Sequence, residues 1–206
     1  MVMFGIYLTK KPPFHSVYLH GIVRATDGKK MSKRLKNYPD PADITNKYGA
    51  DALRYYLLSS PIVRGEDLNF SEKGVDEVVK KSIMRLSSVL SFYQLYEHES
   101  TEFVSERSTH VLDRWILART HELVRDVTRA MDKYELDRAT RPLALFIDDL
   151  STWYIRRSRA RFKSEAQADI SSALNTTKAV LKELSKVMAP FMPFYAESLY
   201  MEVRDE

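Results

Sequence analysis

The chain has 206 residues, of which 44% are hydrophobic and 29% are charged, so it can bury a core and is not intrinsically disordered. It contains no cysteine, which excludes disulfide bonds and a thiolate zinc site, and its net charge of +4 allows an anionic partner without requiring one. No stretch reaches the roughly 18 apolar residues of a membrane span, and we expect a cytoplasmic protein.

The first residues combine an apolar run with a predicted strand. Residues 2–8 are apolar but lack the basic leader and the cleavage site of a signal peptide, so we expect them in the core. Residues 17–23 are mostly β-branched or aromatic, which predicts a strand. That strand should end at the turn Thr26-Asp27-Gly28, where a lysine-rich loop begins.

Helical periodicity covers most of the remaining chain. After Asp40-Pro41, two short helices are expected on either side of Gly49. Four long amphipathic helices and a last short one then follow, over about 75–93, 111–131, 136–162, 170–188 and 195–203. Pro142 predicts a start or a kink in the third of these. Long helices joined by short loops favour an antiparallel bundle, so the expected fold class is mainly α.

Four cations stand on the loop after the predicted strand, namely Lys29, Lys30, Lys33 and Arg34. Open α/β sheets bind ligands beyond the carboxyl ends of their strands, so one interpretation is that this loop meets phosphates. The Gly-x-x-x-x-Gly-Lys spacing of a Walker loop is missing. Considered alone, these residues favour the alternative, which is a basic loop exposed to solvent.

A second basic stretch, residues 153–163, contains five cations and no acid. On a continuous α-helix these cations would form two neighbouring rows and one wide positive face. Arginine pairs with phosphate and stacks on bases, and aromatic rings stack on unpaired bases, so RNA is the natural partner. The candidate contacts are Trp153, Tyr154, Arg156, Arg157, Arg159, Arg161 and Lys163. The alternatives are a solvated charged face and, for Trp153, a place in the core together with Trp115, Phe146 and Phe162.

Several ordered motifs resemble one family. Lys30-Met31-Ser32-Lys33-Arg34 resembles the Lys-Met-Ser-Lys-Ser signature of class I aminoacyl-tRNA synthetases, with Arg34 in place of the final serine. The stretch from Asp148 to Arg159 is similar to a helix in the anticodon-binding domain of the isoleucine-specific members. Arg64-Gly65-Glu66-Asp67-Leu68 favours isoleucine over valine, and acidic Glu66 and Asp67 are interpreted as structural.

The resemblance implies a function and a division of the chain. The full-length protein would activate isoleucine with ATP, with Mg²⁺ as the counterion of ATP, and would charge tRNA. Lys30 and Lys33 would be the catalytic, phosphate-stabilising pair within an ATP-binding loop formed by Lys30, Met31, Ser32, Lys33 and Arg34. Residues 1–37 would end a Rossmann-like catalytic domain, 38–71 would be a connector, and 72–206 an anticodon-binding bundle. No metal site is expected in the chain.

The resemblance also implies partners that these 206 residues lack. A His-x-Gly-His segment, a complete nucleotide-binding sheet and an editing domain are missing from the sequence, so upstream catalytic and editing domains are expected, and the chain alone is expected to be inactive. No membrane partner is expected. The alternatives are a valine-specific relative, a stand-alone helical RNA-binding module without ligase activity, and a purely structural helical domain.

Overall fold

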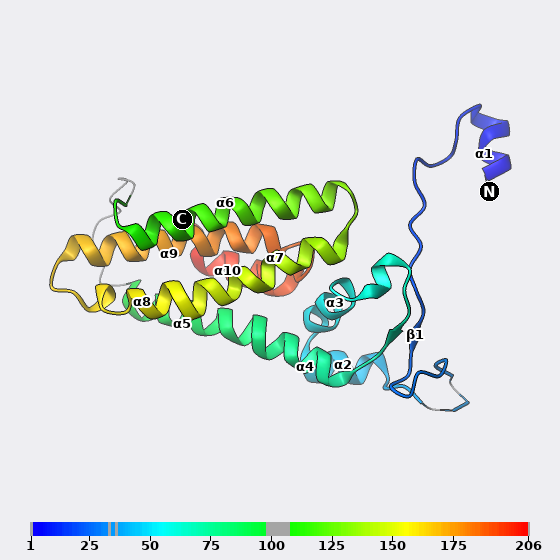
Figure 1. The fold of residues 1–206 in the computed structure, drawn as a ribbon, viewed down its shortest axis with the longest axis horizontal. Coiled ribbons are helices and arrows are strands. Elements are labelled where there is room, and N and C mark those ends of the chain that lie inside the picture. The colour runs from blue at the N-terminus through cyan, green and yellow to red at the C-terminus, as the bar shows by residue number, and fades with distance from the viewer. Residues whose placement is uncertain (1, 33, 36, 98–107, 206) are drawn as a thin grey trace.

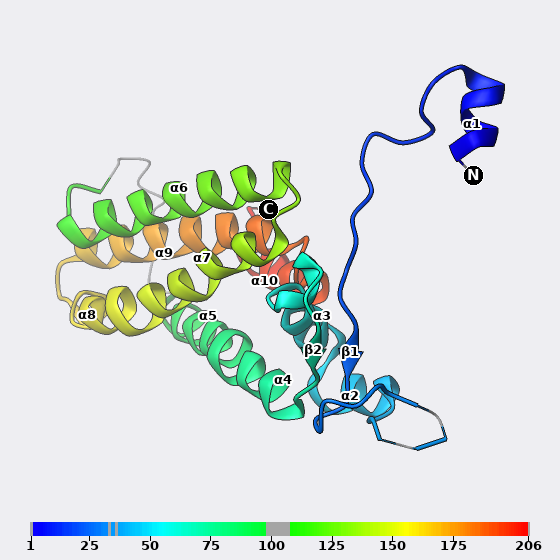
Figure 2. The ribbon, with the colours of Figure 1, turned by 45° about the vertical axis from the view of Figure 1, so that its right-hand side comes forward.

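A computed structural model describes residues 2–32, 34–35, 37–97 and 108–205 of the chain, which are mainly helical. Long helical rods lie side by side and form the body of the molecule, and a smaller unit with two short strands lies at one end (Figure 1). Helix α1 (Val2–Thr9) stands apart from both, at the end of an extended segment (Figures 1 and 2). Within the described residues, no helix combines the length and the apolarity needed to cross a membrane.

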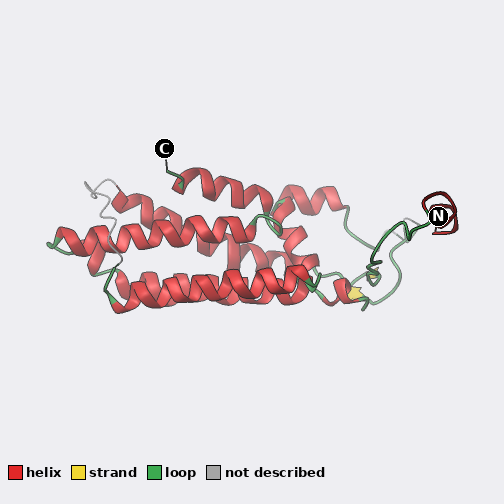
Figure 3. Ribbon diagram, turned by 90° about the horizontal axis from the view of Figure 1, so that it is seen from above, coloured by secondary structure: helices red, strands yellow, loops and turns green. Residues whose placement is uncertain are grey.

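Four rods form the bundle, and they run along a common direction in Figure 3. Two of them are uninterrupted, namely α6 (Val111–Asp132) and α9 (Gln167–Met188). The other two each contain a π-helical turn: α4 (Glu72–Val78), Val79–Ile83 and α5 (Met84–Glu97) form one, and α7 (Leu136–Asp148), Asp149–Ile155 and α8 (Arg156–Ser158) form the other. The short α10 (Pro193–Val203) packs against α9. The predicted helical bundle is therefore confirmed.

Apolar stripes of the rods meet in one core. Phe146 and Phe162 are fully buried as predicted, and Trp115 packs half-buried against the same core. Burying an aromatic or aliphatic side chain of this size stabilises the fold by about 1.5–3 kcal/mol. His110 begins α6 by accepting a hydrogen bond from the backbone N–H of Leu112 at 3.2 Å.

The smaller unit is built around two short helices and two paired strands. Strand β1 (Val23–Arg24) pairs in parallel with β2 (Leu68–Asn69), and the 3-10 turn Pro61–Arg64 lies between α3 and β2. The predicted break at Gly49 separates α2 (Pro41–Tyr48) from α3 (Ala50–Leu58). A second, smaller core holds this unit together, with Ile44, Ala52, Phe70 and Val75 buried in it.

Helix α3 attaches the smaller unit to the bundle by hydrogen bonds. The guanidinium of Arg54 donates to the carbonyl oxygen of Pro190 at 2.9 and 3.3 Å. The carboxylate of Asp51 accepts from the backbone N–H of Tyr195 at 2.6 Å, in the first turn of α10. Such a bond satisfies an N–H that has no partner within its own helix. The smaller unit and the bundle are therefore joined by specific hydrogen bonds.

Two predictions about elements were wrong. Residues 17–22 form no strand; β1 begins only at Val23, because a parallel strand needs a partner and β2 offers two residues. Residues 2–8, expected in the core, lie in α1, which has no buried residue and stands apart from the bundle and the smaller unit (Figures 1 and 2). Pro142 lies inside α7, which excludes the predicted helix start, whereas the predicted kink stays a prediction.

Candidate functional site

The lysine-rich loop leaves β1 through a tight turn. The backbone N–H of Gly28 donates to the carbonyl of Ala25 at 2.8 Å, and the N–H of Ala25 donates to the carbonyl of Lys29 at 2.9 Å. Gly28 has a φ of 79°, a conformation in which a residue with a side chain is strained. The turn brings Lys30 opposite Arg24 in a single antiparallel bridge, so the first lysine of the motif is fixed beside the strand.

Strand β1 itself is held by a close backbone approach. A Cβ atom on Gly21 would lie 1.8 Å from the carbonyl oxygen of Glu66, so the approach requires glycine at this position. The carboxylate of Asp67 accepts from the N–H of Ile22 at 2.9 Å and forms an ion pair with Arg24. These contacts assign Asp67 a structural role.

Met31 anchors the loop to the smaller unit. It lines an apolar cavity of about 310 Å³ whose other lining residues are Val23, Tyr38, Pro39, Pro41, Ile44, Leu53, Leu57 and Phe70. The flexible thioether of methionine suits an irregular apolar space. Met31 therefore faces the connector, while Lys29 and Lys30 are exposed to solvent.

Three cations of the loop are exposed, namely Lys29, Lys30 and Arg34. Lys29 lies 3.6 Å from the carboxylate of Asp27, whereas Lys30 and Arg34 form no ion pair with any carboxylate in the described part of the chain. Lys33 lies outside the described residues, so its predicted role stays a prediction. No group of three His, Asp or Glu side chains among the described residues is placed to hold a metal ion.

The basic stretch 153–163 is not one continuous α-helix. A π-helical segment ends at Ile155, α8 spans Arg156–Ser158, and a 3-10 turn spans Arg161–Lys163. Residues 159 and 160 form a turn, and hydrogen bonds in the 3-10 helix that follows run from i to i+3, so Arg161 and Lys163 leave the α-helical rows. The two predicted rows of cations therefore do not hold.

Arg161 and Tyr154 point into the core and bind Asp113. The guanidinium of Arg161 donates to both carboxylate oxygens of Asp113, at 2.6 and 2.8 Å. The hydroxyl of Tyr154 donates to the same carboxylate at 2.8 Å, and the hydroxyls of Ser108 and Ser172 donate at 2.6 and 2.9 Å. Every polar group around Asp113 is thus a donor.

This network corrects two of the predicted RNA contacts. Tyr154 is 0% exposed and Arg161 is 8% exposed, so neither can reach a nucleic acid at the surface. Burial works to raise the pKa of Asp113, but hydrogen bonds from Arg161 and Ser108 outweigh it and hold that pKa below its usual range. Arg161 is therefore an internal counterion, and Tyr154 supports it.

The remaining candidates are exposed, and we call them the arginine segment: Trp153, Arg156, Arg157, Arg159 and Lys163. Trp153 is 46% exposed, so the alternative that placed it in the core was wrong. The guanidinium of Arg157 lies 3.7 Å from the centre of the Trp153 ring, a cation–π contact. None of the four cations forms an ion pair with a carboxylate of the residues that the structure describes.

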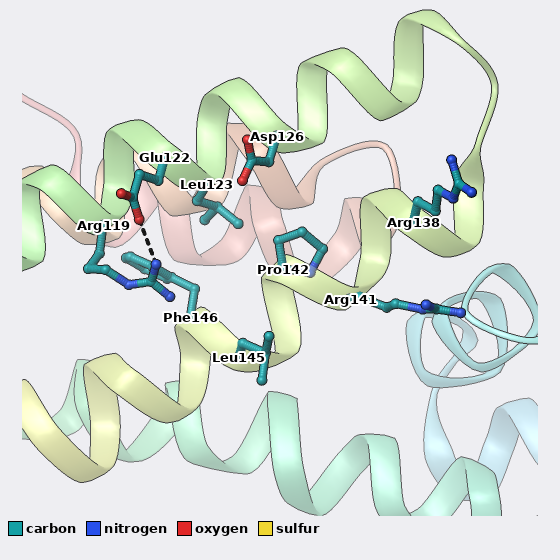
Figure 4. Close-up of a pocket in the computed structure, with 9 residues that line it drawn as sticks. All are labelled: Arg119, Glu122, Leu123, Asp126, Arg138, Arg141, Pro142, Leu145 and Phe146. Atoms are coloured by element: carbon teal, nitrogen blue, oxygen red, sulfur yellow. Dashed lines mark hydrogen bonds and ion pairs between the residues drawn. The ribbon is translucent and has the colours of Figure 1, made fainter.

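A groove between α6 and α7 is another basic feature near the bundle surface (Figure 4). Its volume is about 420 Å³, and Arg119, Arg138 and Arg141 line it. Each of these arginines forms an ion pair with an acidic residue; Arg119, for example, lies 2.6 Å from the carboxylate of Glu122. The three arginine side chains do not converge on one point (Figure 4). The groove therefore offers no concentrated positive charge.

Two family models match the chain in consecutive order. Residues 1–71 match tRNA synthetases class I (I, L, M and V), and residues 113–206 match the anticodon-binding domain of tRNA ligase. The first match contains the lysine-rich loop, and the second contains the arginine segment. The two candidate sites thus fall in two different matched regions.

Curated relatives agree with these matches. The chain is 47% identical to an isoleucine–tRNA ligase of Chlamydia trachomatis over 204 residues, which cover 97% of the chain and 20% of the relative. It is 42% identical to that of Chlamydia pneumoniae over 211 residues, covering 100% of the chain and 20% of the relative. The chain therefore spans about a fifth of the length of the curated relatives it matches.

Solved structures share the fold. The LeuRS of Agrobacterium radiobacter K84, in a ternary complex with tRNA and LeuAMS, matches with a TM-score of 0.75 and 20% identity over 100% of the chain and 24% of that structure. Mycobacterium tuberculosis methionyl-tRNA synthetase in complex with methionyl-adenylate matches with a TM-score of 0.74 and 23% identity, over 87% of the chain and 36% of that structure. At this level of identity, these matches concern the fold alone.

Proposed function

Because this chain belongs to the class I aminoacyl-tRNA synthetases, we propose that the full-length protein activates isoleucine with ATP and transfers it to tRNA. The observation that carries this proposal is the 47% identity to an isoleucine–tRNA ligase over 97% of the chain. Because the chain spans a fifth of such relatives, the activity is proposed for the full-length protein and not for these residues alone.

The lysine-rich loop would stabilise the phosphates of ATP. In adenylate formation the amino-acid carboxylate attacks the α-phosphate, and pyrophosphate leaves with the negative charge. A cation about 4 Å from one phosphate charge gains roughly 4 kcal/mol at an effective dielectric of 20. The gain is larger where charge develops in the transition state. The exposure of Lys30 and Arg34 supports this role, and Lys33 would join them.

The other residues of the loop would shape it. Met31 packs its side chain against the second core, and Ser32 connects it to the remaining cations. Mg²⁺ would arrive with ATP as the counterion of the phosphates. The residues of this chain would then contribute lysine and arginine side chains to the site, and no metal ligand.

The arginine segment would bind the anticodon side of tRNA. Arg156, Arg159 and Lys163 are exposed cations without acidic partners in the described chain, as phosphate contacts require. Arg157 and Trp153 together present a stacked guanidinium and ring, a surface that suits an unpaired base. Isoleucine-specific tRNA is the proposed partner.

We propose the domain division that the sequence indicated, with residues 1–37 ending the catalytic domain, 38–71 forming the connector, and 72–206 forming the anticodon-binding bundle. The second core supports a connector with packing of its own, because Ile44, Ala52 and Phe70 are buried in it, although Val75 of α4 is buried there too. Upstream catalytic and editing domains would complete the enzyme, which we place in the cytoplasm.

Exchange of pyrophosphate into ATP by the full-length protein tests the function. The assay compares isoleucine, valine, leucine and methionine at equal concentrations. Isoleucine is expected to support the fastest exchange. Faster exchange with valine would assign the protein to the valine-specific relatives. Retained tRNA binding without exchange for any amino acid would overturn the ligase proposal and favour a stand-alone RNA-binding module.

A further inference from the structure

We propose that Asn37 is a positioning residue for the lysine-rich loop, an inference that rests on the function proposed above. The Asn37 side chain bonds to two backbone groups at the start of the loop. Its Nδ2 donates to the carbonyl oxygen of Lys30 at 3.2 Å, and its Oδ1 accepts from the backbone N–H of Ser32 at 3.0 Å. One amide thus joins the two ends of the segment 30–37.

The chemistry of the two partners fixes the orientation of the amide. A backbone N–H can only donate and a backbone carbonyl can only accept, so Oδ1 must face Ser32 and Nδ2 must face Lys30. Asparagine is suited to this place because it offers one donor and one acceptor on a short side chain. Aspartate offers the acceptor alone, and alanine offers neither.

Three contacts then hold the backbone around Lys30. On one side Lys30 pairs with Arg24 beside β1. On the other side Asn37 holds its carbonyl, and Met31, the next residue, packs against the second core. The backbone of Lys30 is therefore fixed although its side chain is exposed.

Such fixation matters for a group that must meet a phosphate. A loop free to sample many conformations loses conformational entropy when its cation is held against the leaving group. A loop already closed at its base loses less, and the cation is presented closer to its working position. Asn37 therefore acts through Lys30 and needs no contact with the nucleotide.

Asn37→Ala in the full-length protein tests the inference. Two hydrogen bonds of ordinary strength are removed, so kcat/KM for ATP in pyrophosphate exchange is expected to fall about 10- to 100-fold. The KM for isoleucine and the affinity for tRNA are expected to stay unchanged, and the melting temperature is expected to fall by no more than about a few degrees. Asn46→Ala, on the exposed surface of α2, is the matched control and is expected to change none of these quantities.

Hydrogen exchange provides a readout that does not depend on activity. In Asn37→Ala the Ser32 amide is expected to exchange at least about tenfold faster than in the wild type, because its acceptor is gone. Asn37→Asp keeps the acceptor but lacks the donor, so it is expected to protect the Ser32 amide while still lowering kcat/KM for ATP.

The outcomes separate this inference from the proposed function. If the wild type is active and the kcat/KM of Asn37→Ala for ATP lies within twofold of the wild-type value, the positioning role is overturned. Unchanged hydrogen exchange at the Ser32 amide in Asn37→Ala would overturn the two hydrogen bonds of Asn37 as a clamp on the loop. So would a fall in kcat/KM for isoleucine as large as that for ATP, accompanied by a large loss of thermal stability. A wild type that catalyses no pyrophosphate exchange would instead contradict the proposed function. Hydrogen exchange at the Ser32 amide would still show whether the side chain of Asn37 clamps the loop.

Discussion

Arg161 and Asp113 form a buried bidentate ion pair, with contacts of 2.6 and 2.8 Å, between the 3-10 turn after α8 and the first turn of α6. The pair ties the end of the arginine segment to a neighbouring rod of the bundle. It also removes one cation from the surface, so the segment presents four cations to a partner. The pair therefore controls both the stability and the charge of this region.

Arg161→Met is expected to lower the free energy of unfolding of this chain by about 3–5 kcal/mol, because Asp113 is left buried without its counterion. The double variant Arg161→Met with Asp113→Leu is expected to recover most of that loss, since both charges are gone. Urea unfolding measures the difference. Arg159→Met is the control, because Arg159 is exposed and its loss should change the free energy by no more than about 0.5 kcal/mol.

The same pair predicts a pH dependence. The pKa of Asp113 in the folded chain lies below that in the unfolded chain, so its stabilising contribution is complete above about pH 4 to 5 and is lost as the pH falls through the folded pKa. Between about pH 5 and pH 2, the wild type should lose stability more steeply than the double variant. Parallel curves for the two proteins would contradict this origin of the acid sensitivity.

Periodicity predicted the bundle because each rod buries one face. It could not locate Arg161, because the prediction assumed one α-helix from residue 153 to 163, whereas a π-helical segment and a 3-10 turn change the direction of the side chains. A partial signal was present. Asp113 falls on the stripe of buried Ile116, Thr120 and Leu123, and a buried acid needs a donor. Nothing in one sequence says which distant cation provides it.

The dependence of tRNA affinity on salt should count the exposed cations. If all four contact phosphates, the logarithm of affinity should fall against the logarithm of salt concentration with a slope of roughly −2.8 to −3.6. Arg156→Ala should make the slope shallower by about 0.7 to 0.9. Lys81→Ala removes a cation paired with Glu77 on another rod and should leave the slope unchanged. A slope near zero in the wild type would contradict an electrostatic interface.

Trp153 should report directly on stacking. The chain has two tryptophans, so Trp115→Phe leaves Trp153 as the only indole. Its fluorescence is expected to be quenched when tRNA binds. Trp153→Ala should cost roughly 1–3 kcal/mol of binding free energy if one base stacks there, and Trp153→Phe should restore most of it. Full affinity in Trp153→Ala would show that the ring contacts no base.

The loop shows a different limit of sequence reasoning. Its cations and its resemblance to a signature were visible in the residues themselves, but the contacts that shape it were not. Asn37 lies only a few residues from its partners, yet no pattern of charge or periodicity distinguishes a clamp from an exposed amide. The strand that pairs with β1 lies more than forty residues away in the sequence, so the two-residue length of β1 could not be predicted either.

Measuring both catalysis and tRNA binding on the full-length protein tests most directly whether the chain carries two separate phosphate-binding surfaces. Pyrophosphate exchange and tRNA affinity are measured for Lys30→Ala and for the double variant Arg156→Ala with Arg159→Ala. We predict that Lys30→Ala slows exchange by about 100- to 1,000-fold with tRNA affinity unchanged. The arginine variant should weaken tRNA binding with exchange unchanged. Loss of both properties in either variant, or of neither property in both, would contradict the account.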